Sequence, residues 1–387
     1  MRLARSLDRL GSESAFEVLA RARALEAQGR EVVHLEIGEP DFDTPEHVTA
    51  AGRAALAAGE THYGPAPGMP ALRRAVANEI NRTRGLNVDA EQVIISPGAK
   101  PIMSFTIMAL LEPGDECIYP DPGFPIYESM IRYVGATPVP LPLLEAREFR
   151  FDPADFAARV TDRTRLIILN SPQNPTGGVL ERDDLAAIAK IAAERDIAVL
   201  SDEIYGRILY EGEHHSIASQ PGMAERTIIL DGFSKTYAMT GWRLGYGVFP
   251  PELVPHVVRL MVNTVSCTAS FTQTAGVAAL EGSQDAVCRM VSEFRRRRDA
   301  VVDGLNSVPG LSCLRPRGAF YAFPNVSRTG LDSKRCADYL LQEAGVATLS
   351  GASFGAHGEG YLRLSYANSL PNLEKAIERI REALARI

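Results

Sequence analysis

Short apolar segments alternate with helical segments through the middle of this chain, and this alternation limits the fold more than any other feature. Apolar residues at helical spacing cover 100–111 and 183–195. Strands that are apolar on both faces and separated by helices indicate a mainly parallel sheet with helices covering both sides. The chain is therefore expected to have an α/β fold. The apolar segments lie at 92–96, 116–119, 166–170, 197–201, 227–230 and 246–249.

The length of 387 residues is more than one ordinary core serves, so two domains are expected. We predict a large domain over 46–283, which contains the apolar strands. Residues 1–45 and 284–387 are predicted to form a smaller α+β domain that includes the N-terminal segment. This prediction places a strand over 32–37 and a long helix over about 284–305.

The composition argues against several classes of protein. The net charge of −7 argues against binding to nucleic acid or to an anionic membrane. The five cysteines are scattered without a CxxC pair, so neither a disulfide framework nor a metal site is expected. Residues 1–16 have no signal-peptide core, and no apolar run approaches the roughly 20 residues of a membrane span. We therefore expect a cytoplasmic protein.

Four polar segments follow the apolar strands, at the edge of the sheet where open α/β folds bind ligands. They are 96–100, 170–177, 202–205 and 234–235. One such segment alone is usually structural, because Asn-Pro-Thr-Gly is a common turn and an aspartate after a strand is a common helix cap. Four of them at one edge, with a lysine among them, favour a ligand site.

Lys235 stands between two apolar strands, with Ser234 before it and Arg243 eight positions after it. A lysine whose surroundings disfavour its charge becomes an amine nucleophile that forms an imine with a carbonyl. The serine hydroxyl and the arginine fork suit a phosphate group. An imine-forming lysine beside a phosphate site is what pyridoxal 5′-phosphate (PLP) requires. A lone lysine here would be a surface residue, but the neighbouring polar segments argue against that interpretation.

Other residues of the polar segments match the remaining parts of this cofactor. PLP works best with a protonated pyridine nitrogen, and Asp202 is the candidate carboxylate to stabilise that charge. Tyr205 and Asn174 are candidate donors to the oxygen on the ring. Phe124 is the best aromatic candidate to cover a face of the ring.

Two further groups of residues suit anions. Gly98, Ala99 and Lys100 begin a helix, so their backbone N–H groups are expected to hold a phosphate. Arg363 lies within an alternating apolar strand at 361–366, and a bidentate arginine suits a substrate carboxylate. The local pattern fits an exposed arginine on an edge strand equally well.

Taken together and in their order along the chain, these motifs resemble the class I/II aminotransferase family, the aspartate aminotransferase-like members of the fold type I PLP-dependent enzymes. The resemblance covers nearly the whole length. It implies a mainly parallel seven-stranded sheet sandwiched by helices in the large domain, plus the smaller α+β domain. The matching segments are 38–42, 63–68, 174–177, 201–205 and 234–235, together with Arg243 and Arg363.

The resemblance also implies a homodimer with its active site at the subunit boundary. Tyr63 would then reach the phosphate of the PLP in the partner subunit. The backbone N–H of Gly38 would lie against the substrate carboxylate, and Asn174 would also lie beside the substrate. The N-terminal segment and the smaller domain would close over the substrate.

The reaction that the resemblance implies is the transfer of an amino group between an L-amino acid and a 2-oxo acid with ping-pong kinetics. Lys235 would hold PLP as an aldimine and then move the α-proton, with Asp202 and Tyr205 as the other catalytic residues. A β- or γ-elimination, a replacement or a ring-forming reaction would share every one of these motifs. A PLP-binding regulator without turnover fits less well, because such regulators usually carry a DNA-binding module. A nicotinamide-dependent dehydrogenase also fits less well, because no GxGxxG follows a strand.

The identity of the amino acid stays open at this point. Several family members carry a tryptophan at the place of Phe124, whereas the single tryptophan of this chain, Trp242, lies elsewhere. A preference for aspartate would require a second cation for the distal carboxylate. Lys100, Arg315 and Arg317 are available, but their spacing places none of them in a side-chain pocket.

Overall fold

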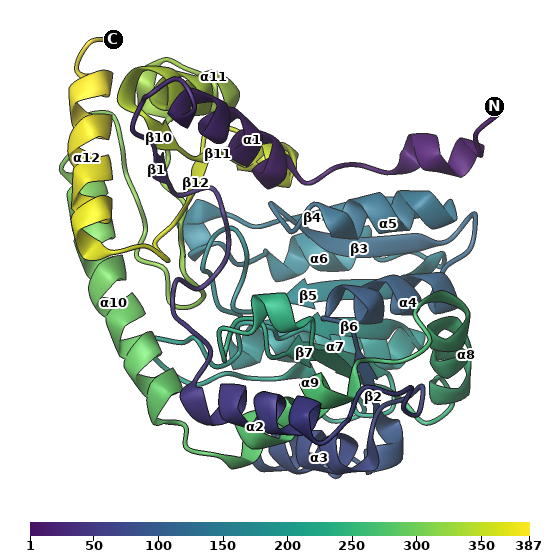
Figure 1. Cartoon of the computed structure of the whole chain (residues 1–387). Helices are drawn as coiled ribbons and strands as arrows, with labels where there is room; N and C mark the ends of the chain where they lie inside the picture. Colours follow the sequence, from purple (N-terminus) through teal and green to yellow (C-terminus); the bar gives the residue numbers. More distant parts are fainter.

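The computed structural model describes residues 1 to 387 (Figure 1). Its centre is a seven-stranded sheet in the order β2-β8-β7-β6-β5-β3-β4. Neighbouring strands pair in parallel, except that β8 runs antiparallel to both β2 and β7. The predicted α/β fold with a mainly parallel seven-stranded sheet is confirmed. The strands are β2 (Val93–Ser96), β3 (Glu116–Asp121), β4 (Thr137–Pro142), β5 (Thr164–Asn170), β6 (Ala198–Asp202), β7 (Thr227–Gly232) and β8 (Gly245–Val248).

Helices cover both faces of this sheet because both faces are apolar. In β5, Leu166 and Ile168 enter one hydrophobic core, which also contains side chains of α4 (Lys100–Leu110). Ile167 and Leu169 point to the opposite face and enter a second core with α7 (Arg182–Arg195). The other helices around the sheet are α2 (Glu46–Ala57), α3 (Pro70–Arg84), α5 (Ile126–Val134), α6 (Pro153–Arg159), α8 (Val254–Thr264) and α9 (Ser270–Glu281).

The N-terminal and C-terminal parts of the chain form the region above and to the left of the sheet in Figure 1. There β1 pairs in parallel with β10, and β12 lies between β11 and β9 in an antiparallel sheet. Helix α12 packs along α10. The elements are α1 (Ser14–Glu26), β1 (Val33–His34), α10 (Asp285–Asn306), β9 (Tyr321–Ala322), α11 (Ser333–Tyr339), β10 (Val346–Ala347), β11 (Leu349–Ser350), β12 (Leu362–Ser365) and α12 (Leu370–Leu384).

The strand predicted over 32–37 is wrong in length. Only Val33 and His34 form β1, because the partner strand β10 is itself two residues long. The residues that follow leave the sheet and lead to the candidate site. The proposed division of the chain at 46–283 stays a prediction.

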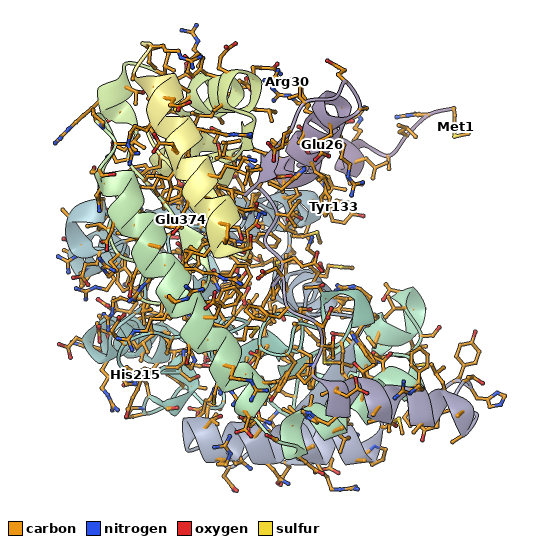
Figure 2. All side chains as sticks on the ribbon, turned by 60° about the vertical axis from the view of Figure 1, so that its left-hand side comes forward. Met1, Glu26, Arg30, Tyr133, His215 and Glu374 are labelled. Atoms are coloured by element: carbon orange, nitrogen blue, oxygen red, sulfur yellow. The ribbon has the colours of Figure 1, made fainter.

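The first residues of the chain extend away from α1. Figure 2 shows Met1 at the tip of this segment. Arg9 ties the segment to the end of α5, because its guanidinium donates to the carbonyl of Tyr133 at 2.6 Å. No helix of the protein has both the length and the apolar character of a membrane span.

Candidate active site

A cavity of about 360 Å³ lies at the carboxyl ends of the central strands. Residues that follow β2, β3, β5, β6 and β7 line it, which is why polar residues far apart in the sequence meet there. Most of the residues predicted from the sequence line this cavity. They are Gly38, Ala99, Lys100, Phe124, Asn174, Asp202, Tyr205, Ser234, Lys235, Arg243 and Arg363.

Lys235 is the amine in this cavity. Burial lowers its pKa to about 8, and the nearby charge of Arg363 acts in the same direction. Its Nζ donates to the carbonyl oxygen of Gly38 at 2.5 Å and has no carboxylate partner. A larger share of this lysine is therefore neutral near pH 8 than of an ordinary surface lysine, as nucleophilic and base chemistry require.

Asp202 is a buried carboxylate at the end of β6. Tyr127 donates its phenolic hydroxyl to Asp202 Oδ2 at 2.6 Å, and the N–H of Ile204 donates to Oδ1 at 3.2 Å. Burial raises the pKa of Asp202 to about 6, although both hydrogen bonds oppose this change. A cation that faces this carboxylate would therefore stabilise its charged form.

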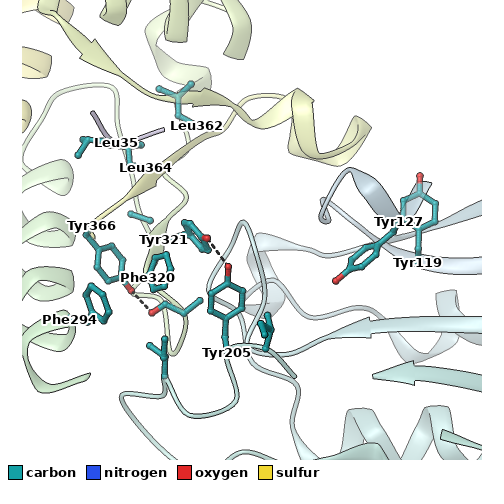
Figure 3. Close-up of a cluster of buried hydrophobic side chains, with 14 of the residues drawn as sticks. Leu35, Tyr119, Tyr127, Tyr205, Phe294, Phe320, Tyr321, Leu362, Leu364 and Tyr366 are labelled. Carbon is teal, nitrogen blue, oxygen red and sulfur yellow. Dashed lines mark hydrogen bonds between the residues drawn. The ribbon is translucent and has the colours of Figure 1, made fainter. Parts of the chain in front are cut away.

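Tyr205 belongs to a buried pair of tyrosines. Its hydroxyl lies 2.7 Å from that of Tyr321, and Figure 3 shows the two side chains pointing at each other. Burial raises the pKa of both phenols, so both are neutral at physiological pH. Tyr321 also lies against Gly38, where an added Cβ atom would come 2.2 Å from its hydroxyl oxygen. Glycine at position 38 therefore allows the close approach of these two segments.

Arg363 is a buried cation without an anionic partner. Only 4% of the residue is exposed, and its guanidinium donates to the side-chain oxygen of Asn174 at 3.3 Å and to the carbonyl of Glu36. The guanidinium carbon lies 4.6 Å from the centroid of the Tyr321 ring, and Nε has no partner. The alternative of an exposed arginine on an edge strand is wrong, because β12 is the central strand of its sheet. A buried cation that lacks a counter-ion suits an anionic ligand.

The start of α4 and Arg243 form a second cationic area. Gly98 has φ +84°, and an added Cβ atom would lie 2.1 Å from Arg243 Nη2, so only glycine permits this approach. The backbone N–H of Ala99 donates to no group of the protein. Ser234 lines the same cavity. This combination of donors suits a phosphate.

Gly98 and Tyr63 are the two predicted site residues that do not line this cavity: Gly98 lies against Arg243, which does line it, whereas Tyr63 lies elsewhere. Tyr63 is 92% exposed and lies outside the set of residues that line the site. The side chain of Lys100 lines the cavity, whereas Arg315 and Arg317 do not. These two arginines instead bond to carboxylates elsewhere, namely Asp299, Asp303 and Glu181.

Sequence reasoning missed several residues that line the site, and three of them contact the groups described above. Tyr127 holds Asp202, Tyr321 contacts Tyr205 and Arg363, and Glu13 lines the cavity from the start of α1. Glu13 and Tyr321 lie outside the segments that follow the strands of the central sheet, whereas Tyr127 follows β3, three residues after Phe124. Their hydrogen-bond partners in the site lie at least 75 positions away along the chain, so spacing carried no signal for these contacts.

Comparisons with known proteins agree with this geometry. The family model described as aminotransferase class I and II matches residues 30–380. An aspartate aminotransferase of Pyrococcus abyssi is 42% identical, with 92% of each chain covered. Aromatic-amino-acid aminotransferase 2 of Thermococcus litoralis is also 42% identical, with 92% of this chain and 93% of the relative covered. The solved structure of an aspartate aminotransferase from Thermus thermophilus with maleate superposes with a TM-score of 0.94 at 39% identity, covering 99% of this chain and 100% of that one.

Proposed function

This chain belongs to the class I and II aminotransferase family and transfers amino groups between amino acids and 2-oxo acids, and we propose that it does so in the cavity around Lys235. Enzymes of this family use PLP. One observation carries the proposal. A buried amine with a pKa lowered to about 8, a buried carboxylate and a buried arginine without a counter-ion share one cavity.

The residues of the cavity fit PLP. The free N–H of Ala99, the hydroxyl of Ser234 and the guanidinium of Arg243 would hold its phosphate, together with the start of α4 at Gly98 and Lys100. The cofactor supplies an electron sink for the charge that develops when the α-proton of an amino acid leaves.

Three side chains would hold the ring of PLP. Asp202 would face its nitrogen, and Tyr205 and Asn174 would donate to its ring oxygen. Phe124 and Ile204 line the cavity as apolar groups for the two faces of the ring. This assignment is supported by the burial of the Asp202 carboxylate, which leaves it in need of a cation.

The remaining residues would bind the substrate and move its proton. Arg363 would take the α-carboxylate in a bidentate contact, with Asn174 and the backbone of Gly38 beside it. Lys235 would act as the base that takes the α-proton and as the acid that returns it. Its lowered pKa supports this role, because a general base works best when its pKa lies near the working pH.

We also propose that two copies of the chain form a homodimer in which Tyr63 completes the phosphate site of the partner. The proposal is supported by the 92% exposure of this aromatic side chain, which finds no place in the cavity of its own chain. The five cysteines are free, which supports a cytoplasmic location, since reducing compartments keep thiols unpaired.

The test is an absorbance spectrum of the PLP-loaded protein before and after single amino acids are added without any 2-oxo acid. We expect the imine band to convert into the band of pyridoxamine phosphate, with release of one 2-oxo acid per site. Lys235→Ala should lack both the imine band and the conversion. Product release without pyridoxamine phosphate would instead support elimination, replacement or ring formation. A Lys235→Ala variant that keeps the imine band would refute the assignment of the lysine.

A further inference from the structure

One ion pair lines the candidate active site and takes no part in the functions assigned so far. Lys100 Nζ donates to the carboxylate of Glu13 at 2.8 Å. Glu13 directly precedes α1, whereas Lys100 begins α4 on the central sheet, 87 positions further along the chain. Both side chains line the same cavity as Lys235 and Arg363.

The charge of the Glu13 carboxylate acts on two groups of the reactive part of the cavity. Burial lowers the pKa of Lys235 and that of Arg363, and the charge of Glu13 is among those that counteract this change. Its side chain is only 26% exposed. A substrate bound by Arg363 therefore has the Glu13 carboxylate within electrostatic range.

Lys100 is the one cation in the cavity whose side chain has no role in the proposed function. Its ammonium group lies 5.4 Å from the centroid of the Phe124 ring, so an aromatic face and a carboxylate both hold it. Arg315 and Arg317 lie outside the cavity. Within one chain, a second carboxylate on a substrate would thus find a single candidate cation, and Glu13 already neutralises it.

Apolar residues near Glu13 in the sequence and after β1 also line the cavity. Ala15 and Phe16 follow Glu13 on α1, and Ile37 comes from the segment after β1. Phe16 is 63% exposed, although it is a large aromatic residue. An exposed aromatic side chain at the rim of a cavity offers an apolar ligand a contact surface.

We propose that the Glu13–Lys100 pair makes this enzyme select amino acids with uncharged, apolar or aromatic side chains over dicarboxylic ones. The inference rests on the function and the site proposed above. A dicarboxylic substrate brings its second carboxylate next to Glu13 and has to displace Glu13 before it gains Lys100 as a counter-ion. An uncharged side chain leaves the pair intact and contacts Phe16 and Ile37. Specificity of this kind arises from repulsion of one class of ligand as well as from attraction of the other.

The test compares the wild type with Glu13→Gln, both loaded with PLP, in the half-reaction with L-phenylalanine and with L-aspartate. We expect the wild type to have the higher kcat/KM for phenylalanine. Glu13→Gln should raise kcat/KM for aspartate about tenfold, because the amide removes the like charge and releases Lys100. The value for phenylalanine should change by less than about twofold.

Two further variants separate the pair from general effects of charge. Glu17→Gln removes the same charge one turn further along α1, outside the cavity, and should change neither value. In the double variant with Glu13→Gln and Lys100→Met, the gain for aspartate should disappear, since the methionine cannot bind a carboxylate.

Two different failures can be told apart. A wild type that prefers aspartate overturns the inference, and so does a Glu13→Gln variant whose preference stays the same or moves toward phenylalanine. Both results leave the aminotransferase function in place. If none of the amino acids tested converts the wild type to the pyridoxamine phosphate form, the result contradicts the proposed site instead.

Discussion

Replacing Tyr127 by Phe should move the acid limb of the pH–rate profile to higher pH. The Tyr127 hydroxyl donates to Asp202 Oδ2 at 2.6 Å, and no other protein group donates to that oxygen. The phenylalanine ring keeps the packing, including the edge contact with Phe124 at 5.6 Å between centroids. The change therefore removes one hydrogen bond to a buried carboxylate and little else.

The size of the effect follows from that bond. A hydrogen bond to a charged group contributes about 1.5–3 kcal/mol. At 1.36 kcal/mol per unit of pKa, its loss raises the pKa of Asp202 by roughly one to two units. Burial raises this pKa to about 6, and the hydroxyl of Tyr127 and the N–H of Ile204 both limit the increase. A cationic PLP ring facing Asp202 would lower its pKa in wild type and variant alike, so the difference between the two proteins is the quantity to compare.

The assay is kcat/KM for the best amino acid in single-turnover half-reactions from pH 5 to pH 9. Asp202 must be ionised to stabilise the ring cation, so activity falls as the pH drops through its pKa. Tyr119→Phe is the matched control, because this buried tyrosine of β3 does not line the cavity; Figure 3 shows it near Tyr127. An acid limb that stays in place in a folded Tyr127→Phe protein, or that moves to lower pH, refutes the reasoning.

Three other substitutions test further parts of the site. Arg363→Lys should raise KM for the amino acid by about 10- to 100-fold with a smaller change in kcat, because an ammonium cannot form the bidentate contact; an unchanged KM would place the carboxylate elsewhere. Asp202→Asn should stabilise the ligand-free protein at pH 8, on the order of 1–3 kcal/mol in urea unfolding, while activity collapses. Burial raises the pKa of Asp202 from 3.8 to about 6, so its charged form opposes folding above that pH, and the gain should vanish below about pH 4. Gly38→Ala should lower kcat/KM, because its Cβ atom would lie 2.2 Å from the Tyr321 hydroxyl oxygen, and a wild-type rate would contradict this steric argument.

The strands of the central sheet could be predicted because burial on both faces leaves a purely apolar sequence. Strand β4 was missed because its sequence does not have this form. It contains Pro138, Pro140 and Pro142, and proline lacks the N–H that an inner strand has to donate. The structure places β4 at the edge of the sheet, where it pairs only with β3. Proline at alternate positions is compatible with such an edge. The prolines of β4 therefore indicate an edge strand and do not exclude a strand.

Some residues of the candidate site could also be predicted from the sequence, and others could not. Asp202 and Lys235 could be found because each follows an apolar strand of one sheet, and the ends of parallel strands converge. Tyr127 and Tyr321 could not, because their partners lie 75 and 116 positions away along the chain. Sequence reasoning identified the groups to which we assign the chemistry. It missed the neutral hydroxyls that hold those groups, since their contacts depend on tertiary packing alone.

Three titratable groups of the cavity have charged forms that burial disfavours. Burial raises the pKa of Asp202 and lowers those of Lys235 and Arg363, so each group is pushed toward its neutral form. A structural ion pair would stabilise the charged forms of its two partners, as in the Glu13–Lys100 pair nearby. The three groups instead bond to hydroxyl, amide or backbone partners, which position them without neutralising their charge. A cationic ring, a carbonyl carbon and a substrate carboxylate are the partners that would do so, and this explains why Asp202→Asn is expected to gain stability where it loses activity.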